Sequence, residues 1–353
     1  MNKKLIVVAV AAGLALPMTS ASALEVAGKK LDVYGKLHLS IDQSDTDGLV
    51  TTDGLSVSSN SSRLGFKGEL PAGALKFVYQ VESEVFYDEA GGKLANRNTY
   101  AGLKGGFGKF IVGNYDTPYK TVASKWGVFG DSVGERRSML GAGYSKGNQL
   151  NERAQNSMMY EMKTKSLKFQ AMYAVDPESG TDGLVDNSNK NVLSLGLIYK
   201  AGPLWLGVSQ ETWEGHSKIE NGDALRLGAK FKVSSGIQLG LIYESIDSDT
   251  VNEWKRDAYG FNAKFKLNKA TDIRAQYIAV DDADGTTDTG ATKVSLGLFH
   301  KLDKKAQVYV AYGATDNDAN AKFQAVDGGH GDEVKTVNGG SPSSISAGLI
   351  YKF

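Results

Sequence analysis

The chain has 353 residues, and its 40 Lys and Arg residues balance its 40 Asp and Glu residues, so the formal net charge is zero. A neutral chain has no long-range field to attract nucleic acid, and the absence of cysteine excludes disulfides, thiol catalysis and cysteine-ligated metal. The 42 Gly, 16 Tyr and 13 Phe residues suit short strands with tight turns better than helices. Composition therefore favours an all-β protein.

The first 23 residues have the pattern of a secretory signal peptide. Lys3 and Lys4 precede an apolar run, Leu5–Leu16, and Ala21–Ala23 form a small-residue cleavage signature. This run is too short for a transmembrane helix, and no later segment has 18 consecutive apolar residues. We therefore predict cleavage after Ala23, export from the cytoplasm, and one mature domain of residues 24–353.

From residue 31 onwards, apolar and polar residues alternate with the period of two that is typical of β-strands. In Leu31–Asp42 the odd positions are apolar or glycine, and the even positions are polar or tyrosine. Such segments predict sixteen strands, which begin near residues 31, 57, 74, 97, 108, 153, 167, 191, 204, 223, 236, 257, 272, 293, 306 and 344. The two strands near residues 97 and 108 alternate poorly, so their facing is left open.

The connections between the predicted strands alternate between tight turns and long polar segments. Examples of the turns are 105–107, 234–235 and 302–305. The long segments are 43–56, 86–96, 116–152, 176–190, 213–222, 247–256, 281–292 and 314–343. This rhythm predicts an up-and-down antiparallel meander. The third long segment, Asp116–Glu152, is the longest, and loops of that length are usually functional or disordered.

The number of strands decides which face meets water. A soluble sandwich or small barrel would pack its apolar face inward, but sixteen strands closed into one barrel leave a wide aqueous interior. The polar face is therefore predicted to line water and the apolar face to contact lipid. Strands cross a bilayer only as a closed barrel, so the last strand, which ends at Phe353, should pair with the first. Aromatic residues near strand ends then suit the membrane interfaces: Tyr79, Tyr160, Tyr199, Tyr243, Phe265 and Phe353.

Several segments resemble the general, diffusion-type porins of Gram-negative outer membranes. They are "DVYGKLHLS" (Asp32–Ser40), "SRLGFKGEL" (Ser62–Leu70), "RNTYAGLKGGFGKFIVGNYDTPY" (Arg97–Tyr119) and the closing "GLIYKF". The resemblance implies a transmembrane antiparallel β-barrel of 16 strands with short periplasmic turns, long extracellular loops and a third loop folded into the lumen. It also implies a homotrimer in the cell outer membrane that contacts lipid and lipopolysaccharide.

The same resemblance implies passive diffusion of ions and small hydrophilic solutes, without enzyme activity or cofactor. Phe353 would act as the membrane assembly signal of the family. Strand parity alone places Lys36, Arg63 and Arg153 away from the apolar face. The resemblance adds Arg97 and implies that the four form a basic wall opposite carboxylates of the third loop.

The third loop supplies the other predicted constriction residues. Asp116, Asp131 and Glu135 are its available carboxylates, and Arg136 and Arg137 follow Glu135 directly. A transverse field between the two sides would orient dipolar solutes and disfavour apolar ones. Because the loop carries both signs of charge, the preference for cations or anions stays open.

Alternatives to a passive pore are weighed against the same residues. A substrate-specific channel for a nutrient or an anion would need a binding site or an aromatic track in the lumen, whereas the inward positions are mixed Lys, Glu, Gln and Ser. An enzyme embedded in a barrel would have its Ser–His pair on lipid-facing positions. A soluble β-rich export would need the apolar faces to cover one another.

Two aspartate-rich loop tips and the four histidines are the candidate metal ligands of the sequence. Ile246–Asp257 and Asp281–Gly290 could share divalent cations with lipopolysaccharide, but "DDADG" lacks the spacing and terminal Glu of a calcium loop. The four histidines share no ligand spacing. No metal site is predicted, and solvated turns are the simpler interpretation of the tips.

Overall fold

The computed structural model describes residues 24–26, 30–49, 53–143, 150, 153–177, 190–216, 220–249, 253 and 255–353. The predicted signal peptide, residues 1–23, lies outside this part, as does a portion of the acidic tip Ile246–Asp257. Among the described residues, no helix is long and apolar enough to cross a membrane.

Nineteen strands of the described chain pair into one sheet. They are β1 (Leu24–Val26), β2 (Leu31–Asp45), β3 (Gly54–Ser59), β4 (Arg63–Ala72), β5 (Leu75–Val85), β6 (Gly92–Lys93), β7 (Thr99–Gly105), β8 (Gly108–Asp116), β9 (Arg153–Lys163), β10 (Leu167–Val175), β11 (Asn191–Ala201), β12 (Leu204–His216), β13 (Glu220–Lys232), β14 (Ile237–Ser248), β15 (Arg256–Lys266), β16 (Thr271–Val280), β17 (Ala291–Lys301), β18 (Ala306–Asn317) and β19 (Ser343–Lys352).

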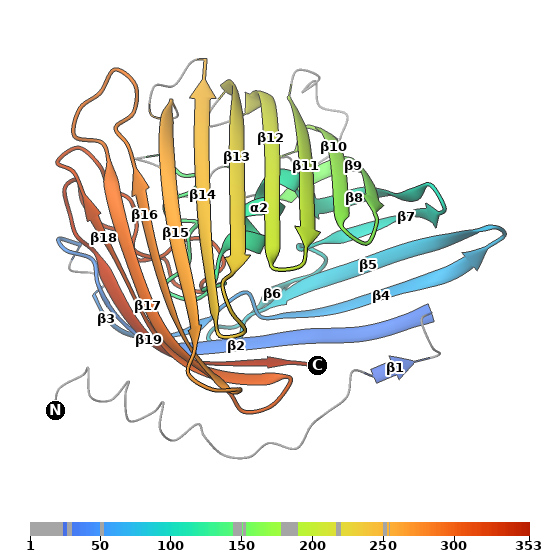
Figure 1. Ribbon diagram of the computed structural model, residues 1–353, viewed down its shortest axis with the longest axis horizontal. Helices are drawn as coiled ribbons and strands as arrows, with labels where there is room; N and C mark the ends of the chain where they lie inside the picture. Colours follow the sequence, from blue (N-terminus) through green and yellow to red (C-terminus); the bar gives the residue numbers. More distant parts are fainter. Residues whose placement is uncertain are drawn as a thin grey trace.

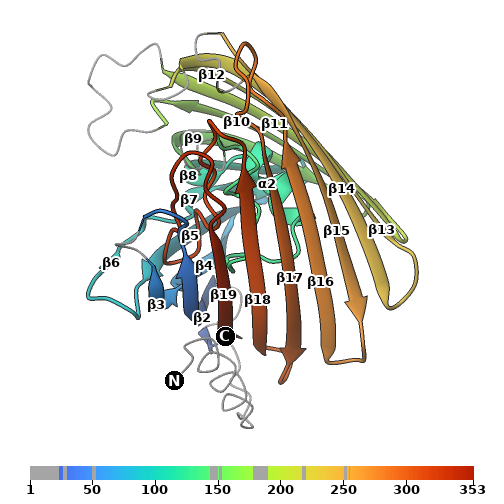
Figure 2. The same cartoon turned by 90° about the vertical axis from the view of Figure 1, so that its left-hand side faces the viewer.

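These strands form a closed antiparallel barrel (Figures 1 and 2). β3 and β4 both pair with β2, and β6 and β7 both pair with β5, so each couple is one interrupted strand. β1 is a three-residue addition beside β2. The described chain therefore has sixteen spanning strands, and the pairing of β19 with β2 closes the ring. The predicted strand number, order and pairing of the last strand with the first are confirmed.

Two predicted long segments are shorter than expected. β12 extends to His216 and β13 begins at Glu220, so most of the predicted segment 213–222 is strand. Likewise β2 extends to Asp45 and β3 begins at Gly54 inside the predicted segment 43–56. Both differences have one cause. Polar residues predict loops, but the strands of a barrel continue as paired strands beyond the apolar band, where most of their residues are polar.

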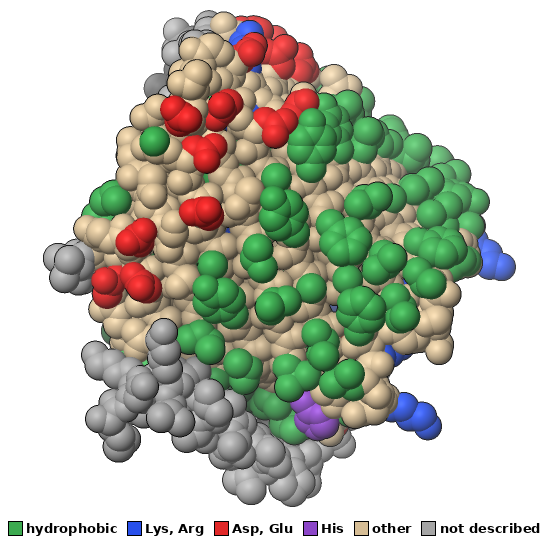
Figure 3. Space-filling model, turned by 60° about the vertical axis from the view of Figure 1, so that its left-hand side comes forward, with side chains coloured by type: hydrophobic (Ala, Val, Ile, Leu, Met, Phe, Trp, Pro, Cys, Tyr) green, Lys and Arg blue, Asp and Glu red, His purple; other side chains and the backbone are tan. Residues whose placement is uncertain are grey.

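The two faces of the barrel have the predicted polarity. In β2 from Lys36 to Ser44, the even residues, such as His38 and Asp42, are buried in the interior, while the odd ones are partly exposed. The apolar residues Leu193, Leu195 and Leu197 of β11 are 43%, 37% and 40% exposed on the outside. Figure 3 shows this outer apolar band on one face, with acidic side chains gathered above it. The apolar face is therefore available to lipid.

In β7 and β8, for which the sequence did not show which side chains point outwards, apolar side chains also lie on the outer face. Leu103, Phe110 and Val112 lie on the exposed side. Ile111 is buried and packs inside the barrel with Tyr100 and Tyr115. The rings of this tyrosine pair are 5.3 Å apart. The inner wall thus holds an aromatic pair that the inward pattern of Lys, Glu, Gln and Ser had not led us to expect.

The C-terminal residue closes the barrel seam. Phe353 exchanges two backbone hydrogen bonds with Gly35, at 3.1 and 3.2 Å. A Cβ at Gly35 would lie 2.3 Å from Cζ of Phe353, so glycine is required where the aromatic ring crosses β2. Beyond Phe353, Leu24 of β1 pairs with Val33 on the same edge of β2. The terminal aromatic is therefore part of the barrel wall.

The long segment between β8 and β9, which we call loop 3 (residues 117–152, described at 117–143 and 150), lies inside the barrel (Figures 1 and 2). It begins with α2 (Pro118–Trp126), where Thr117 caps the helix by accepting a hydrogen bond from the Lys120 backbone N–H. Proline at the first helical position favours this start.

Inward-facing glycines make room for loop 3. A Cβ at Gly240 or Gly260 would lie within 3.0 Å of Trp126, and one at Gly207 would lie 3.0 Å from Val122. The barrel wall is therefore flat where α2 packs against it. Glycine is also common in turns and strands for other reasons. The sequence therefore did not indicate that these inward glycines make room for a loop.

This packing corrects one expectation about the interior. Trp126, Met139 and Leu140 of loop 3 form an apolar cluster with inward residues such as Ile242 and Ile278. The inner face was predicted to line water throughout, but the part of the wall formed by β14–β17 is covered by loop 3. A period of two marks which side a residue faces, and it does not distinguish water from an inserted loop.

Candidate pore constriction

The predicted basic wall meets loop 3 through Lys36. Its Nζ atom donates to Oδ2 of Asp131 at 2.7 Å and lies 3.3 Å from the Asn60 carbonyl oxygen. Lys36 points inward from β2, as strand parity predicted. Burial alone would raise the pKa of Asp131, but Lys36 and Arg137 hold it well below its ordinary value. This carboxylate therefore stays ionised and links the loop to the wall.

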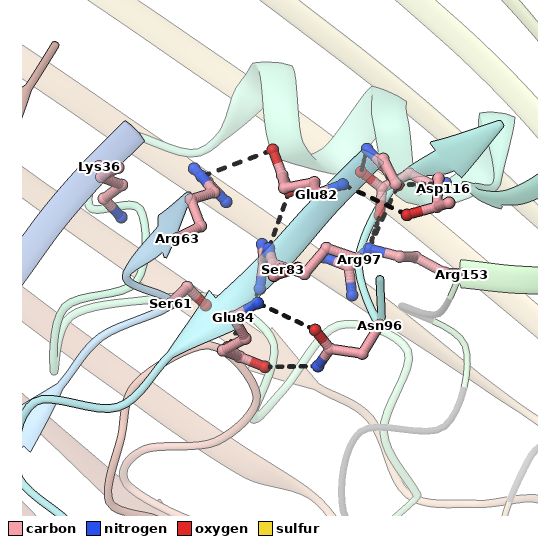
Figure 4. Close-up of polar contacts among 12 residues, drawn as sticks. Lys36, Ser61, Arg63, Glu82, Ser83, Glu84, Asn96, Arg97, Asp116 and Arg153 are labelled. Carbon is pink, nitrogen blue, oxygen red and sulfur yellow. Dashed lines mark hydrogen bonds and ion pairs between the residues drawn. The ribbon is translucent and has the colours of Figure 1, made fainter. Parts of the chain in front are cut away.

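Arg63 and Arg97 have different partners from those that the resemblance implied. Arg97 is buried and donates from Nε to Glu82 at 2.9 Å and from Nη1 to Glu84 at 3.1 Å (Figure 4). Arg63 lies 4.0 Å from Glu82 and remains 25% exposed at its side chain. Both arginines thus contact acidic residues of β5 in the wall, and Arg63 also lies near enough to Asp131 of loop 3 to help lower the pKa of that carboxylate.

Sequence reasoning missed Glu82 and Glu84. In "FVYQVESEV" they stand on the same strand face as Gln80, so parity does place them inward. The resemblance implied carboxylates of loop 3 as the partners of Arg97. Arg97 meets Glu82 because β5 and β7 are neighbouring antiparallel strands, and the Arg97 backbone N–H also donates to the Glu82 carbonyl oxygen at 3.1 Å.

Arg153 and Asp116 lie at the two ends of loop 3. Arg153 Nε is 3.3 Å from Asp116 Oδ1, and the same oxygen is 2.8 Å from Lys120 Nζ. Asp116 is the last residue of β8, whereas we had counted it among the loop carboxylates. Burial lowers the pKa of Lys120 to about 8, against the opposing effect of the Asp116 carboxylate. Lys120 is a further basic residue that sequence reasoning did not single out.

The charges of the predicted segment Asp131–Arg137 are largely paired with one another. Arg137 donates to Glu135 at 2.9 Å and to Asp131 at 2.6 Å. Burial by itself would lower the pKa of Arg137, but these two carboxylates raise it above its ordinary value. Arg136 turns away and donates to the Ser124 hydroxyl at 3.0 Å. The loop tip therefore presents little unpaired negative charge.

A buried anchor holds loop 3 on the opposite wall. Glu244 of β14 accepts hydrogen bonds from the Tyr119 hydroxyl at 3.1 Å and from the Gly141 backbone N–H at 2.7 Å. Arg226 of β13 also donates to Glu244 and, at 3.0 Å, to the Tyr119 carbonyl oxygen. Arg226 and Glu244 are fully buried. Their inward parity was readable from the sequence, but their pairing with the loop was not.

The segment between β18 and β19, which we call the last loop (residues 318–342), contacts the wall near β2 and β3. The Ser61 hydroxyl donates to the Gly329 carbonyl oxygen at 2.9 Å, and the Gly331 N–H donates to Asn60 Oδ1 at 2.8 Å. His330 Nε2 lies 3.4 Å from Asp42 Oδ2. Burial would lower the pKa of His330, but the Asp42 carboxylate raises it overall.

No group of three or more His, Asp or Glu in the described residues is arranged to hold a metal ion. In the acidic tip Asp281–Gly290, Asp282 instead accepts hydrogen bonds from the backbone N–H groups of Thr289 and Gly290. The divalent-cation hypothesis thus gains no support from the described part of either tip.

A closed barrel with an apolar exterior, a charged interior and a loop folded into its lumen is a membrane-spanning β-barrel channel. The sequence profile of the Gram-negative porin family matches residues 6–320, so the chain belongs to this family. It is an outer-membrane porin through which small solutes diffuse passively, and the family and fold are those of channels without enzymatic activity.

Individual relatives are distant. The chain is 24% identical to a monosaccharide porin from Halomonas sp. over the whole length of both chains. It is 29% identical to the major outer membrane protein P.IB of Neisseria meningitidis over 34% of this chain and 39% of that protein. An anion-selective porin from Comamonas acidovorans superposes with a TM-score of 0.73 at 22% identity, over 92% of this chain and 99% of that one. OmpT of Vibrio cholerae superposes with a TM-score of 0.69 at 20% identity, over 94% and 100%.

Proposed function

We propose that solutes crossing this porin are selected at a constriction between loop 3 and the basic wall of Lys36, Arg63, Arg97 and Arg153. The observation that carries the proposal is the 2.7 Å contact between Lys36 of β2 and Asp131 of loop 3. Behind the loop, the apolar cluster around Trp126 fills the space towards β14–β17. At the level of the Lys36–Asp131 contact, the charged side chains that line the constriction lie on β2–β9, so ions and small hydrophilic solutes pass on that side.

A cross-linking experiment tests the placement of loop 3. The chain contains no cysteine, so the double variant K36C/D131C introduces the only two thiols. A short bifunctional thiol reagent should join them in the folded barrel and change the gel mobility after proteolysis between the two sites. The matched pair K36C/K335C, with its second thiol on the last loop, should not be joined. Absence of the first cross-link would contradict the proposed constriction.

The remaining features of the proposal follow from family membership. We propose cleavage of residues 1–23 as a signal peptide, a homotrimer embedded in lipid and lipopolysaccharide, and transport with no chemical step. One similar solved structure, OmpT of Vibrio cholerae, is described as a trimer form. Cross-linking of native outer membranes followed by electrophoresis tests the trimer, because a monomeric pore would give no species of three-fold mass.

A substrate-specific channel is the second candidate function. The inward pair Tyr100 and Tyr115 supports it, because aromatic faces with a nearby cation, here Lys109 at 5.4 Å from the Tyr100 ring centre, suit uncharged polar ligands. The monosaccharide porin relative points to a class of solute to try. Saturable block of single-channel current by a monosaccharide, abolished in Y100A, would favour this candidate over simple diffusion.

A further inference from the structure

Two adjoining cavities lie below loop 3, at the end of the barrel that carries the tight turns. One measures about 560 Å³ and is bounded by the turn between β13 and β14, and the other measures about 400 Å³ and is bounded by the turn between β17 and β18. Both are lined by Gly127, Val128 and Arg274. We call the two together the basic vestibule. In this family the tight turns face the periplasm.

Positive residues dominate the lining of the basic vestibule. Among the described residues around the two cavities, eleven are Lys or Arg and two are Asp. The basic residues are Lys36, Arg63, Lys230, Lys232, Lys264, Lys266, Arg274, Lys301, Lys304, Lys305 and Lys352, and the acidic ones are Asp131 and Asp303. The chain is neutral overall, so this excess is local.

The nearby carboxylates neutralise only part of this charge. Asp131 is bound to Lys36 and Arg137, and Asp303 accepts hydrogen bonds from backbone N–H groups of its own turn. Asp272 pairs with Lys264 at 2.9 Å and with Arg274 at 2.6 Å. In the described part of the chain, no carboxylate pairs with Lys230, Lys232 or Lys266.

The position of Lys230 shows how the vestibule is built. Its ammonium group donates to the Lys125 carbonyl oxygen, at the C-terminal end of α2. It also lies 5.0 Å from the ring centre of Trp205. A helix C-terminus and an aromatic face both attract a cation without cancelling its charge as a carboxylate would. The lysine is thus held beside loop 3 with its positive charge available.

The opposite side of the same mouth differs. A third cavity, of about 850 Å³, is lined by residues of β2, β4, β5 and β7–β9. Four of its five lysines have carboxylate partners, among them Lys67 with Asp32 at 3.3 Å, Lys104 with Glu69 at 2.6 Å and Lys109 with Glu161 at 3.4 Å. Among the described residues, unpaired positive charge is therefore concentrated in the basic vestibule.

We propose that the basic vestibule is a binding site for small anions bearing phosphate or carboxylate groups, and that it makes the porin prefer anions to cations. Several like charges around two adjoining, partly open cavities raise the local concentration of counter-ions and disfavour co-ions. The inference rests on the proposed placement of loop 3, because Gly127 and Val128 form the boundary of both cavities.

Reversal potentials of the full-length mature porin in planar bilayers test the preference. Under a KCl gradient, chloride should permeate faster than potassium. The dilute side should contain about 0.1 M KCl, because charges then interact over about 10 Å. The variant K230Q/K232Q/K266Q should lower the chloride-to-potassium ratio at least about two-fold. The control K165Q/K269Q/K335Q removes the same number of charges outside the cavities and should change the ratio much less. Cation preference in the wild type, or equal effects of both variants, would overturn the proposal.

Inorganic phosphate is the probe for binding. Added from the periplasmic side, it should reduce the chloride current of the wild type saturably and that of K230Q/K232Q/K266Q weakly. Because the wild-type titration needs no substitution, the absence of block would by itself overturn the binding site, even if the variant failed to fold. Failure of the anion site leaves the K36C/D131C cross-link intact, whereas failure of the proposed constriction abolishes that cross-link.

Discussion

The Lys36 ammonium group of β2 lies 2.7 Å from the Asp131 carboxylate of loop 3. On the other side of the lumen, Glu244 of β14 accepts hydrogen bonds from Tyr119 and Gly141 of the same loop. Loop 3 is therefore attached to two walls of the barrel. Polar contacts on both walls act together with the apolar cluster around Trp126, and the polar contacts can be tested by substitution.

Arg63 and Arg97 should respond differently to the loss of charge. R63Q removes a partly exposed positive charge that has one 4.0 Å contact, so the reversal potential in a salt gradient should shift towards cations. R97Q instead leaves Glu82 and Glu84 without their buried partner, a type of loss that costs about 3–5 kcal/mol. We expect R97Q to lower the temperature at which the barrel unfolds in detergent. An unchanged reversal potential in R63Q would place Arg63 outside the ion path.

E244Q should loosen loop 3. The substitution removes the counter-charge of Arg226, which is fully buried, and weakens the acceptor for Tyr119 and Gly141. Loss of one partner from a buried ion pair costs about 3–5 kcal/mol, enough to release the loop for part of the time. Single-channel recordings should show flickering between conductance levels.

E333Q is the matched control for E244Q. Glu333 pairs with Lys335 on the exposed last loop, and its side chain is 46% exposed. Loss of such a surface pair changes stability by less than about 1 kcal/mol. If E244Q channels do not flicker between conductance levels and are as stable as the wild type, the buried anchor does not restrain the loop.

The last loop should loosen as the pH rises. The folded pKa of His330 lies above its ordinary value of 6.5, so the cationic form favours the contact with Asp42. This contribution is complete below the ordinary value and is lost as the pH rises through the folded value. The charged groups near His330 are Asp42 and Asp332, and Arg137 lies against the neighbouring residue Gly329. Open-channel current noise should therefore increase as the pH rises above 6.5 and through the folded pKa of His330.

H330Q provides the comparison for this pH dependence. Glutamine retains hydrogen-bonding capacity but does not titrate, so the noise of H330Q should not change with pH. A variant whose noise rises with pH as much as that of the wild type would assign the effect to another group.

G35V should impair assembly in the same way as deletion of Phe353. A valine side chain at this position would overlap the Phe353 ring, and the deletion removes both backbone hydrogen bonds across the seam. The yield of folded barrel in the outer membrane, measured by heat-dependent gel mobility, should fall several-fold in both variants. G106A is the control, because no atom lies within 4 Å of an added Cβ there. Normal assembly of G35V would separate the ring contact from the role of the terminus.

Strand order, strand number and the polarity of the two faces could be predicted from the sequence. Alternation is a property of consecutive residues, and in Leu31–Asp42 it runs without interruption. The inward direction of Lys36, Arg63 and Arg153 followed from the same rule. Loop lengths were predicted less well, because polar residues occur both in loops and in the strand ends that extend beyond the lipid.

The partners of the charged residues of loop 3 were decided by the tertiary structure. Glu244 meets Tyr119, and Lys36 meets Asp131, because loop 3 folds across the lumen. Arg97 and Glu82, in contrast, lie on neighbouring segments of one hairpin. Likewise, inward glycines such as Gly240 and Gly260 acquire their meaning only when Trp126 lies against them. Local alternation determines which way a side chain points, whereas its neighbour across the lumen depends on the curvature of the whole sheet and on the path of a loop that obeys no periodic rule.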